Sequence, residues 1–364
     1  MNPFKPTAGK MPPELIGRDS IIEDFIDGIE NGVGAPERLM RLTGVRGMGK
    51  TVLLNELGRI VKDKGWLVID EIATPGLCTR ILEELTSRNQ LASLHFNPSV
   101  LGISLGSVEI ERASLNLRKS MVNYLKGNKS GLLITLDEVQ DVTIDEVRAL
   151  SVAIQQVIGE DLNIAFVFAG LPSMVDNVVN AKALTFLRRA LPEDLIPLWP
   201  EDVKQSFLET IADSGMDISE SAAEYMTEAS AGYPFMVQLV GYYTWRSASK
   251  RNSGIIELND AVSGAETARK RFDRMVIEPA IQNLPATLLT YLIAMAEDKG
   301  APSKVGVVAE RLGKDLTALS SYRSRLIKEN IIESRMRGEV EFVIPYMAEY
   351  LNEHYSILID EMNY

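Results

Sequence analysis

The chain has 364 residues, of which 46% are hydrophobic and 24% are charged. This composition is that of an ordinary globular protein and excludes fibrous and extensively disordered classes. At about 150 residues per domain, the length predicts two or three domains. The net charge of −12 argues against wholesale coating of DNA or of an anionic membrane, because the summed field repels polyanions. Contact with nucleic acid would therefore need a local basic patch.

The N-terminal stretch MNPFKPTAGKMPPEL lacks the apolar segment of a signal peptide, and no later stretch approaches the ~18 apolar residues that span a bilayer. We therefore expect a cytoplasmic protein with no membrane partner. The single cysteine, Cys78, cannot form an internal disulfide, and the two histidines, His95 and His354, are too few for a zinc-type cluster. Any metal ion is expected to arrive with a nucleotide.

The first half of the chain alternates apolar runs with amphipathic segments. Strands are expected at residues 38–42, 66–73, 131–138 and 162–172. Helices are expected at residues 50–65, 77–88 and 144–158. Strands that are apolar on both faces and alternate with helices predict a parallel sheet covered on both sides. Residues 93–113 break this rhythm, and we expect an inserted hairpin or a long loop there.

The loop after the first strand has the spacing G-x-x-x-x-G-K-[ST], formed by Gly44, Gly49, Lys50 and Thr51. Its backbone N–H groups and the N-terminus of the following helix favour phosphate binding. Lys50 would reach the β- and γ-phosphate oxygens, and the Thr51 hydroxyl would ligate Mg²⁺. The alternative is a chance match, expected in on the order of one sequence in a hundred. The loop residues expected to bind nucleotide are Gly44, Val45, Arg46, Gly47, Met48, Gly49, Lys50, Thr51 and Val52.

An acidic pair, Asp137 and Glu138, follows the third predicted strand directly. Asp137 would hold the Mg²⁺ shell, and Glu138 would orient or deprotonate the attacking water. Such a pair at a strand end is common by itself, so its meaning depends on the phosphate loop. Together the two motifs predict that ATP and Mg²⁺ are bound and that ATP is hydrolysed to ADP and phosphate.

The second half of the chain is predominantly helical. Helices are expected at residues 201–213, 219–231, 234–250 and 259–277. Shorter helices are expected at residues 284–297, 304–312 and 317–329, and residues 331–345 alternate around Arg337-Gly338 as a hairpin does. Three helices and a wing-like hairpin are the elements of a winged helix-turn-helix. The predicted fold class is α/β, with a P-loop NTPase parallel-sheet core, an α-helical lid and a C-terminal winged helix-turn-helix.

These motifs, in this order, resemble the AAA+ ATPases, specifically the branch of origin-recognition-complex-like and archaeal-type ATPases that ends in a winged helix. The resemblance covers nearly the whole chain and implies domains at residues 1–198 (ATPase core), 199–278 (helical lid) and 279–364 (winged helix with a C-terminal helix). The segment PPELIGRDSIIEDFIDGI resembles the box that precedes the core in this branch, in which Leu15, Ile16, Gly17 and Arg18 would pack on the adenine. The alternative for this segment is a simple helix start with Asp19 as its N-cap.

The sequence departs from the family pattern at the end of the fourth strand. A polar sensor residue is expected there, but the chain has Ala169, Gly170 and Leu171, with Ser173 lying past the site. Gln140 is a candidate for ordering the attacking water in its place, and a solvated loop glutamine is the alternative. We expect slow or partner-dependent turnover as a consequence.

Two further positions follow from the resemblance. Arg188 or Arg189 falls where related enzymes carry an arginine finger, although an arginine pair at a helix end is also typical of a solvated surface. The segment AGYPFMVQLVGYY lacks the arginine sensor of many AAA+ lids and is similar to the G-x-P motif of signal-transduction NTPases. Pro234 would then abut the nucleotide, and the alternative is an ordinary proline in a first helical turn.

The predicted recognition helix and wing form a locally basic stretch. The DNA-binding candidates are Arg323, Arg325, Lys328, Arg335 and Arg337. Leu316, Leu319, Leu326 and Ile327 would form the apolar stripe of that helix. Salt-dependent binding of duplex DNA is one expectation. Because winged helices also bind proteins and the tail after Pro345 is acidic, a protein partner or self-association is the other. The chain is thus expected to be a DNA-associated ATP switch or a signalling or defence-type ATPase regulator.

Overall fold

The computed structural model describes residues 1–7, 9–88, 107–128, 130–181, 184–252, 254–334 and 336–362. The chain forms two compact units. The sheet unit consists of Gly17–Gly44 and Gly49–Ile196, and the helical unit consists of Met1–Ile16, Val45–Met48 and Pro197–Tyr364. The three domain ranges expected from the sequence remain a prediction.

The sheet unit contains a five-stranded parallel sheet with the order β2-β3-β4-β1-β5. The strands are β1 (Leu39–Thr43), β2 (Leu67–Ile72), β3 (Leu132–Asp137), β4 (Ile164–Gly170) and β5 (Leu191–Asp194). The central strands β3 and β4 are buried along their whole lengths, which agrees with their near-continuous apolar sequences. The predicted α/β class and the four predicted strands are confirmed.

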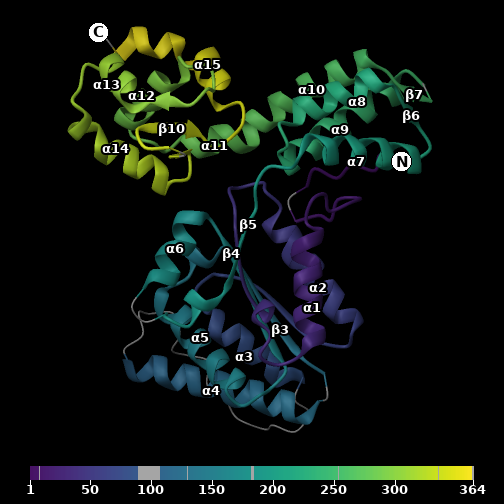
Figure 1. The fold of residues 1–364 in the computed structure, drawn as a ribbon, viewed down its shortest axis with the longest axis vertical. Coiled ribbons are helices and arrows are strands. Elements are labelled where there is room, and N and C mark those ends of the chain that lie inside the picture. Colours follow the sequence, from purple (N-terminus) through teal and green to yellow (C-terminus); the bar gives the residue numbers. More distant parts are fainter. Residues whose placement is uncertain are drawn as a thin grey trace. The chain divides into compact units, whose positions relative to one another are not determined.

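Helices cover both faces of this sheet (Figure 1), with α1 and α2 on one side and α3, α4 and α5 on the other. The helices are α1 (Asp19–Asn31), α2 (Lys50–Asp63), α3 (Leu77–Arg88), α4 (Ser107–Gly127), α5 (Ile144–Ile158) and α6 (Pro172–Asn180). Short 3₁₀ turns are η1 (Pro36–Arg38), η2 (Val139–Asp141) and η3 (Leu187–Arg189). A large apolar core joins α3, α4 and α5 to one face of β3 and β4.

One prediction for this unit was wrong, and one strand was not predicted. The end of the predicted 93–113 insertion is not a hairpin or loop, because α4 begins at Ser107. Its buried residues recur with helical spacing: Ile110, Ala113, Leu117, Met121, Tyr124 and Leu125. Residues 89–106 lie outside the described ranges.

The fifth strand, β5, was not predicted, because Pro192 and the flanking acidic residues argue against a strand. Proline is tolerated at β5 because this strand lies at the edge of the sheet.

The helical unit begins with a helical bundle. Its elements are α7 (Pro200–Asp213), β6 (Asp217–Ile218), α8 (Glu220–Ser230), α9 (Pro234–Lys250), β7 (Ile255–Ile256), α10 (Leu258–Phe272), the π-helical turn η4 (Asp273–Ile277) and α11 (Glu278–Ile281). The four helices expected from the sequence are present. The N-terminal segment packs on this bundle, where the buried ring of Phe4 lies against Gly241 and Phe207.

The remaining elements of the helical unit are α12 (Ala286–Ala296), β8 (Ser303–Lys304), α13 (Val305–Arg311), α14 (Leu316–Lys328), β9 (Ile332–Glu333), β10 (Glu339–Phe342) and α15 (Met347–Met362). The strands form an antiparallel sheet with the order β8-β10-β9, so the expected hairpin is present. Leu319 and Leu326 of α14 are fully buried, but Leu316 is 55% exposed and does not continue the apolar stripe. No helix in the described ranges is long and apolar enough to cross a membrane.

Candidate nucleotide-binding site

Lys50 and Thr51 are the first two residues of α2, and Gly49 precedes them in the left-handed conformation with φ 88°. The buried Lys50 side chain folds back over the loop, and its Nζ donates a hydrogen bond to the carbonyl oxygen of Gly44 at 2.7 Å. The ammonium group is thus held at the N-terminus of α2, where the helix dipole also favours an anion. This geometry is compatible with the predicted phosphate loop.

The sheet order brings Thr51 and Asp137 together. The Thr51 hydroxyl donates a hydrogen bond to Asp137 Oδ2 at 2.5 Å. Burial raises the pKa of Asp137 and the charge of Glu138 adds to this shift, whereas the Thr51 hydrogen bond and Lys50 oppose it. A buried carboxylate beside a hydroxyl is an oxygen donor pair that suits Mg²⁺, which usually takes one or two protein ligands and completes its shell with waters and phosphates. Among the described residues, no group of three or more His, Cys, Asp and Glu side chains could hold a metal ion by itself.

Glu138 follows Asp137 with a left-handed backbone, φ 52°. Its N–H group donates to Asp137 Oδ1 at 2.9 Å, and its carboxylate accepts a hydrogen bond from Gln140 Nε2. The end of β4 supplies no polar side chain, as the sequence indicated, and Gly170 lies against the Gln140 amide. Gln140 is therefore not a solvated loop residue, because its Oε1 atom is buried.

The middle of the phosphate loop, Val45–Met48, belongs to the helical unit. The Gly47 carbonyl accepts a hydrogen bond of 3.3 Å from the N–H group of Phe235, which satisfies a donor in the first turn of α9. Pro234 is the first residue of α9, as expected for an ordinary proline in a first helical turn. The hydrogen bond from Phe235, the next residue, holds this turn against Gly47. Val52 lies in the first turn of α2.

Tyr233, which the sequence did not indicate, also contacts the loop. A methyl group added to Gly47 would lie 2.6 Å from the Tyr233 ring. The ring is 1% exposed, and its hydroxyl has no hydrogen-bond partner among the residues that the structure describes. Burial raises the pKa of this phenol, and the positive charge of Arg46 opposes the shift. The sequence feature that could have indicated this contact is the position of Tyr233 between Gly232 and Pro234, in the middle of the G-x-P segment.

The expected adenine-contacting residues divide between the two units, with Leu15 and Ile16 in one and Gly17 and Arg18 in the other. Arg18 is only 6% exposed, and its Nη2 donates to the carbonyl oxygen of Ile196 at 3.1 Å. Asp19 is the first residue of α1 and Arg18 is its N-cap. The alternative reading of Asp19 as the N-cap is therefore wrong.

Arg188 and Arg189 are both exposed on the short turn η3. Arg188 is held at the end of α6, because its guanidinium donates to the carbonyl oxygens of Val179 and Asn180 at 3.0 and 3.1 Å. Within the described ranges, no hydrogen bond or ion pair holds the Arg189 side chain. Arg189 is thus the better placed of the two to reach another molecule.

The basic candidates of the C-terminal region lie on α14 and on the hairpin. Arg325, Lys328 and Arg337 are exposed and Arg323 is half-buried. Arg325 lies 3.9 Å from Glu329, a weak exposed pair. Arg335 lies outside the described residues. Several basic side chains therefore lie on α14 and on the adjoining hairpin.

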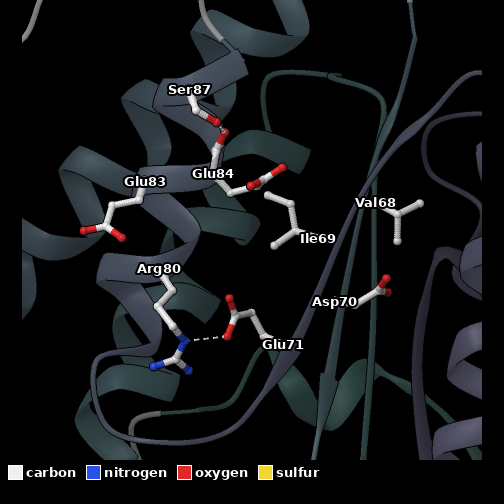
Figure 2. Close-up of a pocket in the computed structure, with 8 residues that line it drawn as sticks. All are labelled: Val68, Ile69, Asp70, Glu71, Arg80, Glu83, Glu84 and Ser87. Carbon is white, nitrogen blue, oxygen red and sulfur yellow. Dashed lines mark hydrogen bonds and ion pairs between the residues drawn. The ribbon is translucent and has the colours of Figure 1, made fainter. Parts of the chain in front are cut away.

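A separate pocket of about 450 Å³ lies between the edge strand β2 and α3 (Figure 2). Acidic side chains dominate its lining, but Glu71 pairs with Arg80 at 2.7 Å, as Figure 2 shows. Asp70 accepts a hydrogen bond from Thr135 and pairs with Lys62. None of the residues predicted to bind nucleotide lines this pocket, and its charges serve the packing of α2 and α3 on the sheet.

Comparison with known proteins supports the fold. The family model described as "Domain of unknown function (DUF8462)" matches residues 274–351, and no curated protein matches the sequence. A Walker-type ATPase of Pyrococcus abyssi is 15% identical over 94% of this chain and 97% of its own, with a TM-score of 0.65.

Two archaeal proteins of the origin-recognition type are also similar. The ORC2 protein of Aeropyrum pernix, solved as ADPNP and ADP complexes, is 14% identical over 98% of this chain and 97% of its own, with a TM-score of 0.63. Cdc6p of Pyrobaculum aerophilum is 18% identical over 98% and 97%, with a TM-score of 0.53. At these identities the likeness concerns the fold: the chain has the P-loop AAA+ fold of the Cdc6 and ORC proteins.

Proposed function

We propose that this protein binds ATP with Mg²⁺, hydrolyses it slowly, and couples its nucleotide state to DNA binding through a C-terminal winged helix. The observation that carries the proposal is the hydrogen bond between the Thr51 hydroxyl and the buried Asp137 carboxylate, next to Lys50 at the start of α2. In this proposal residues 1–198 form the ATPase core, 199–278 the lid and 279–364 the winged helix.

Each residue of the site has a role that its position supports. Lys50 would exchange its hydrogen bond with Gly44 for the β- and γ-phosphate oxygens. Thr51 and Asp137 would hold Mg²⁺, which when bound neutralises charge on the phosphates. Glu138 would accept a proton from the attacking water. Bound adenine would lie near Leu15, Ile16, Gly17 and Arg18, and Pro234 would lie near the nucleotide.

Slow turnover is expected because the proposed site has few groups that could stabilise the γ-phosphate. The end of β4 offers Gly170 in place of a polar side chain, and the start of α9 carries Pro234 and no arginine. Because phosphoryl transfer is driven by positioning and electrostatic stabilisation, fewer such groups mean a higher barrier. Arg189 of a second copy is a candidate for the missing cation, which would make turnover depend on assembly.

Coupling to the C-terminal region is supported by a continuous aromatic contact path within the helical unit. Tyr233, against Gly47, meets Phe272 edge-on with ring centroids 5.5 Å apart, and Phe272 lies 6.5 Å from Tyr346. The Arg269 guanidinium lies 4.2 Å from the Tyr346 ring centroid. Tyr346 directly precedes α15, so movement of the loop has a packed route to the C-terminal elements.

DNA binding is supported by the order α12, β8, α13, α14, β9 and β10, which is that of a winged helix, and by the exposed cations of its α14 and hairpin. Basic residues that neutralise phosphates make the affinity for DNA depend on salt. The logarithm of the binding constant falls with the logarithm of the salt concentration, with a slope of about −0.9 for each neutralised phosphate. Arg325→Ala/Arg337→Ala should therefore weaken duplex binding and flatten the salt dependence. Binding that is unchanged by these substitutions and by exchange of ATP for ADP would refute the DNA-coupled switch.

The ATPase proposal is tested by nucleotide binding and turnover, with and without random duplex DNA, together with the mass of the protein in ATP and ADP. Lys50→Ala should abolish nucleotide binding, whereas Glu138→Gln should retain binding and lose hydrolysis. Wild-type hydrolysis in Glu138→Gln would show that another group is the base. A mass that rises only in ATP would favour assembly through Arg189.

A second candidate is a signalling or defence-type ATPase regulator whose winged helix contacts a protein. Exposed apolar side chains favour it, because Leu316 at the start of α14 is 55% exposed and Met336 in the hairpin is 64% exposed. A shallow hollow of about 820 Å³ between α13 and α14 also includes Leu316. The double variant Leu316→Ser/Met336→Ser is the matched counterpart of Arg325→Ala/Arg337→Ala. Loss of a protein contact or of self-association in this variant, with DNA binding retained, would favour the protein-binding regulator.

A further inference from the structure

Glu138 is held by its neighbours through its backbone and through its carboxylate. Its own N–H group donates to Asp137 Oδ1, and its carbonyl oxygen accepts a 2.9 Å hydrogen bond from the N–H group of Asp141, which closes the turn η2. Its side chain accepts a hydrogen bond from Gln140 Nε2. The left-handed backbone of Glu138, which is unfavourable for a non-glycine residue, is thus held by local contacts.

The other end of the Gln140 amide is buried at the end of β4. Its Oε1 atom has no hydrogen-bond partner among the described residues. A methyl group added to Gly170 would lie 2.7 Å from this atom and 2.9 Å from Val175 Cγ2. Gly170 does not have a left-handed backbone, so the position requires glycine for space and not for conformation. Any larger residue at the end of β4 would displace the amide.

We propose that Gln140 is a positioning residue for Glu138, and that Gly170 leaves β4 without a polar side chain in order to admit the Gln140 amide. The proposal rests on the ATP hydrolysis proposed above. In that reaction the water oxygen bonds to the γ-phosphorus, the bond from that phosphorus to the β–γ bridging oxygen breaks, and the water proton passes to Glu138. The amide N–H group holds one carboxylate oxygen, which leaves the other to accept this proton.

The burial of Oε1 separates this role from that of a glutamine in a solvated loop. A buried carbonyl without a partner is destabilising, and a solvated side chain would avoid this cost by turning to water. The Gln140 amide is instead held between Glu138 and Gly170. An amide constrained at both ends limits the rotation of the carboxylate, which is how residues that orient a reacting group contribute to catalysis.

The first test separates turnover from binding. Gln140→Leu keeps the side-chain size but removes the amide, and it should lower kcat on the order of 100-fold, the loss expected when a reacting group is misplaced, while the Kd for ATP changes less than twofold. Gln156→Leu, at an exposed glutamine of α5, is the matched control and should retain wild-type turnover. Equal kcat in Gln140→Leu and wild type would overturn the positioning role. Absence of hydrolysis in the wild type, relative to Lys50→Ala, would instead refute the proposed ATPase activity.

The second test needs no turnover. Gly170→Ala should lower the Tm of the wild type because its methyl group overlaps the amide, and it should lower the Tm less in a Gln140→Ala background, where that space is vacant. Residues in contact give such non-additive effects, and distant ones do not. We expect the two losses to differ by about 2–4 °C in a unit of this size. Equal losses would overturn the proposed contact and with it the role of Gly170.

Discussion

Gly47 is the position at which one methyl group tests how the phosphate loop is held. In Gly47→Ala the added Cβ would lie 2.6 Å from the Tyr233 ring, and the backbone φ is +83°. The left-handed conformation costs alanine about 1–2 kcal/mol. The overlap adds about 1–3 kcal/mol, because the Tyr233 ring is buried and a packed core yields little.

Gly215 isolates the second contribution. It belongs to the same unit and has a φ of +82°, but nothing lies within 4 Å of its added Cβ. Gly215→Ala should therefore show the backbone cost alone. We expect Gly47→Ala to lower the Tm further by about 2–4 °C for each kcal/mol of overlap, as measured by differential scanning calorimetry without nucleotide.

A double-mutant cycle completes this test. In a Tyr233→Leu background the smaller side chain leaves room for the methyl group, so Gly47→Ala and Gly215→Ala should then cost nearly the same. Similar Tm losses for the two variants in the wild-type background would refute the packing of the loop on Tyr233. A cost of Gly47→Ala that persists undiminished beside Tyr233→Leu would refute the ring as its cause.

Two further outcomes are expected. Tyr233→Phe removes a buried hydroxyl without a described partner and should raise the Tm by about 2–4 °C, the equivalent of about 1 kcal/mol; a loss of stability would show that the hydroxyl is satisfied. The Arg311 guanidinium donates two hydrogen bonds to Asp298 and lowers the pKa of that carboxyl. This stabilisation is present above the ordinary Asp pKa and is lost as the pH falls through the lowered one. Asp298→Asn should therefore lower the Tm at pH 7 but not once the pH lies below that lowered pKa, and a constant difference across a pH series would contradict this linkage.

The sequence predicted the parts of the site that depend on local spacing. The loop from Gly44 to Thr51 and the pair Asp137 and Glu138 each occupy one short segment, and the chemistry of phosphate and Mg²⁺ limits the residue types they can use. The alternation of strands and helices then implied that these segments meet at one edge of a parallel sheet. The contact between Thr51 and Asp137 agrees with that inference.

Features that depend on packing between distant segments could not be predicted. The burial of Tyr233 against Gly47 needs the start of α9 to lie on the loop, and a tyrosine before a proline does not indicate that by itself. The edge position that makes Pro192 acceptable in β5 follows from sheet order and not from the residues of the strand. The α4 error had a local cause, since a few alternating apolar residues at its start resembled a strand although the longer stretch has helical spacing.

The strength of the proposed switch is bounded by the difference between ATP and ADP binding. A ligand shifts a two-state equilibrium only by its differential affinity, and a shift from 1:99 to 99:1 needs about 5.5 kcal/mol. Hydrogen bonds to a charged group contribute about 1.5–3 kcal/mol each, so two to four groups specific to the γ-phosphate would be required. In the proposed site these groups are Lys50 and the proposed Mg²⁺ ligands Thr51 and Asp137, and the end of β4 and the first turn of α9 add no further cation. Where each of these groups contributes near the lower end of that range, the proposed switch would shift only part of the population, and one more group, such as Arg189 of a second copy, would complete the shift.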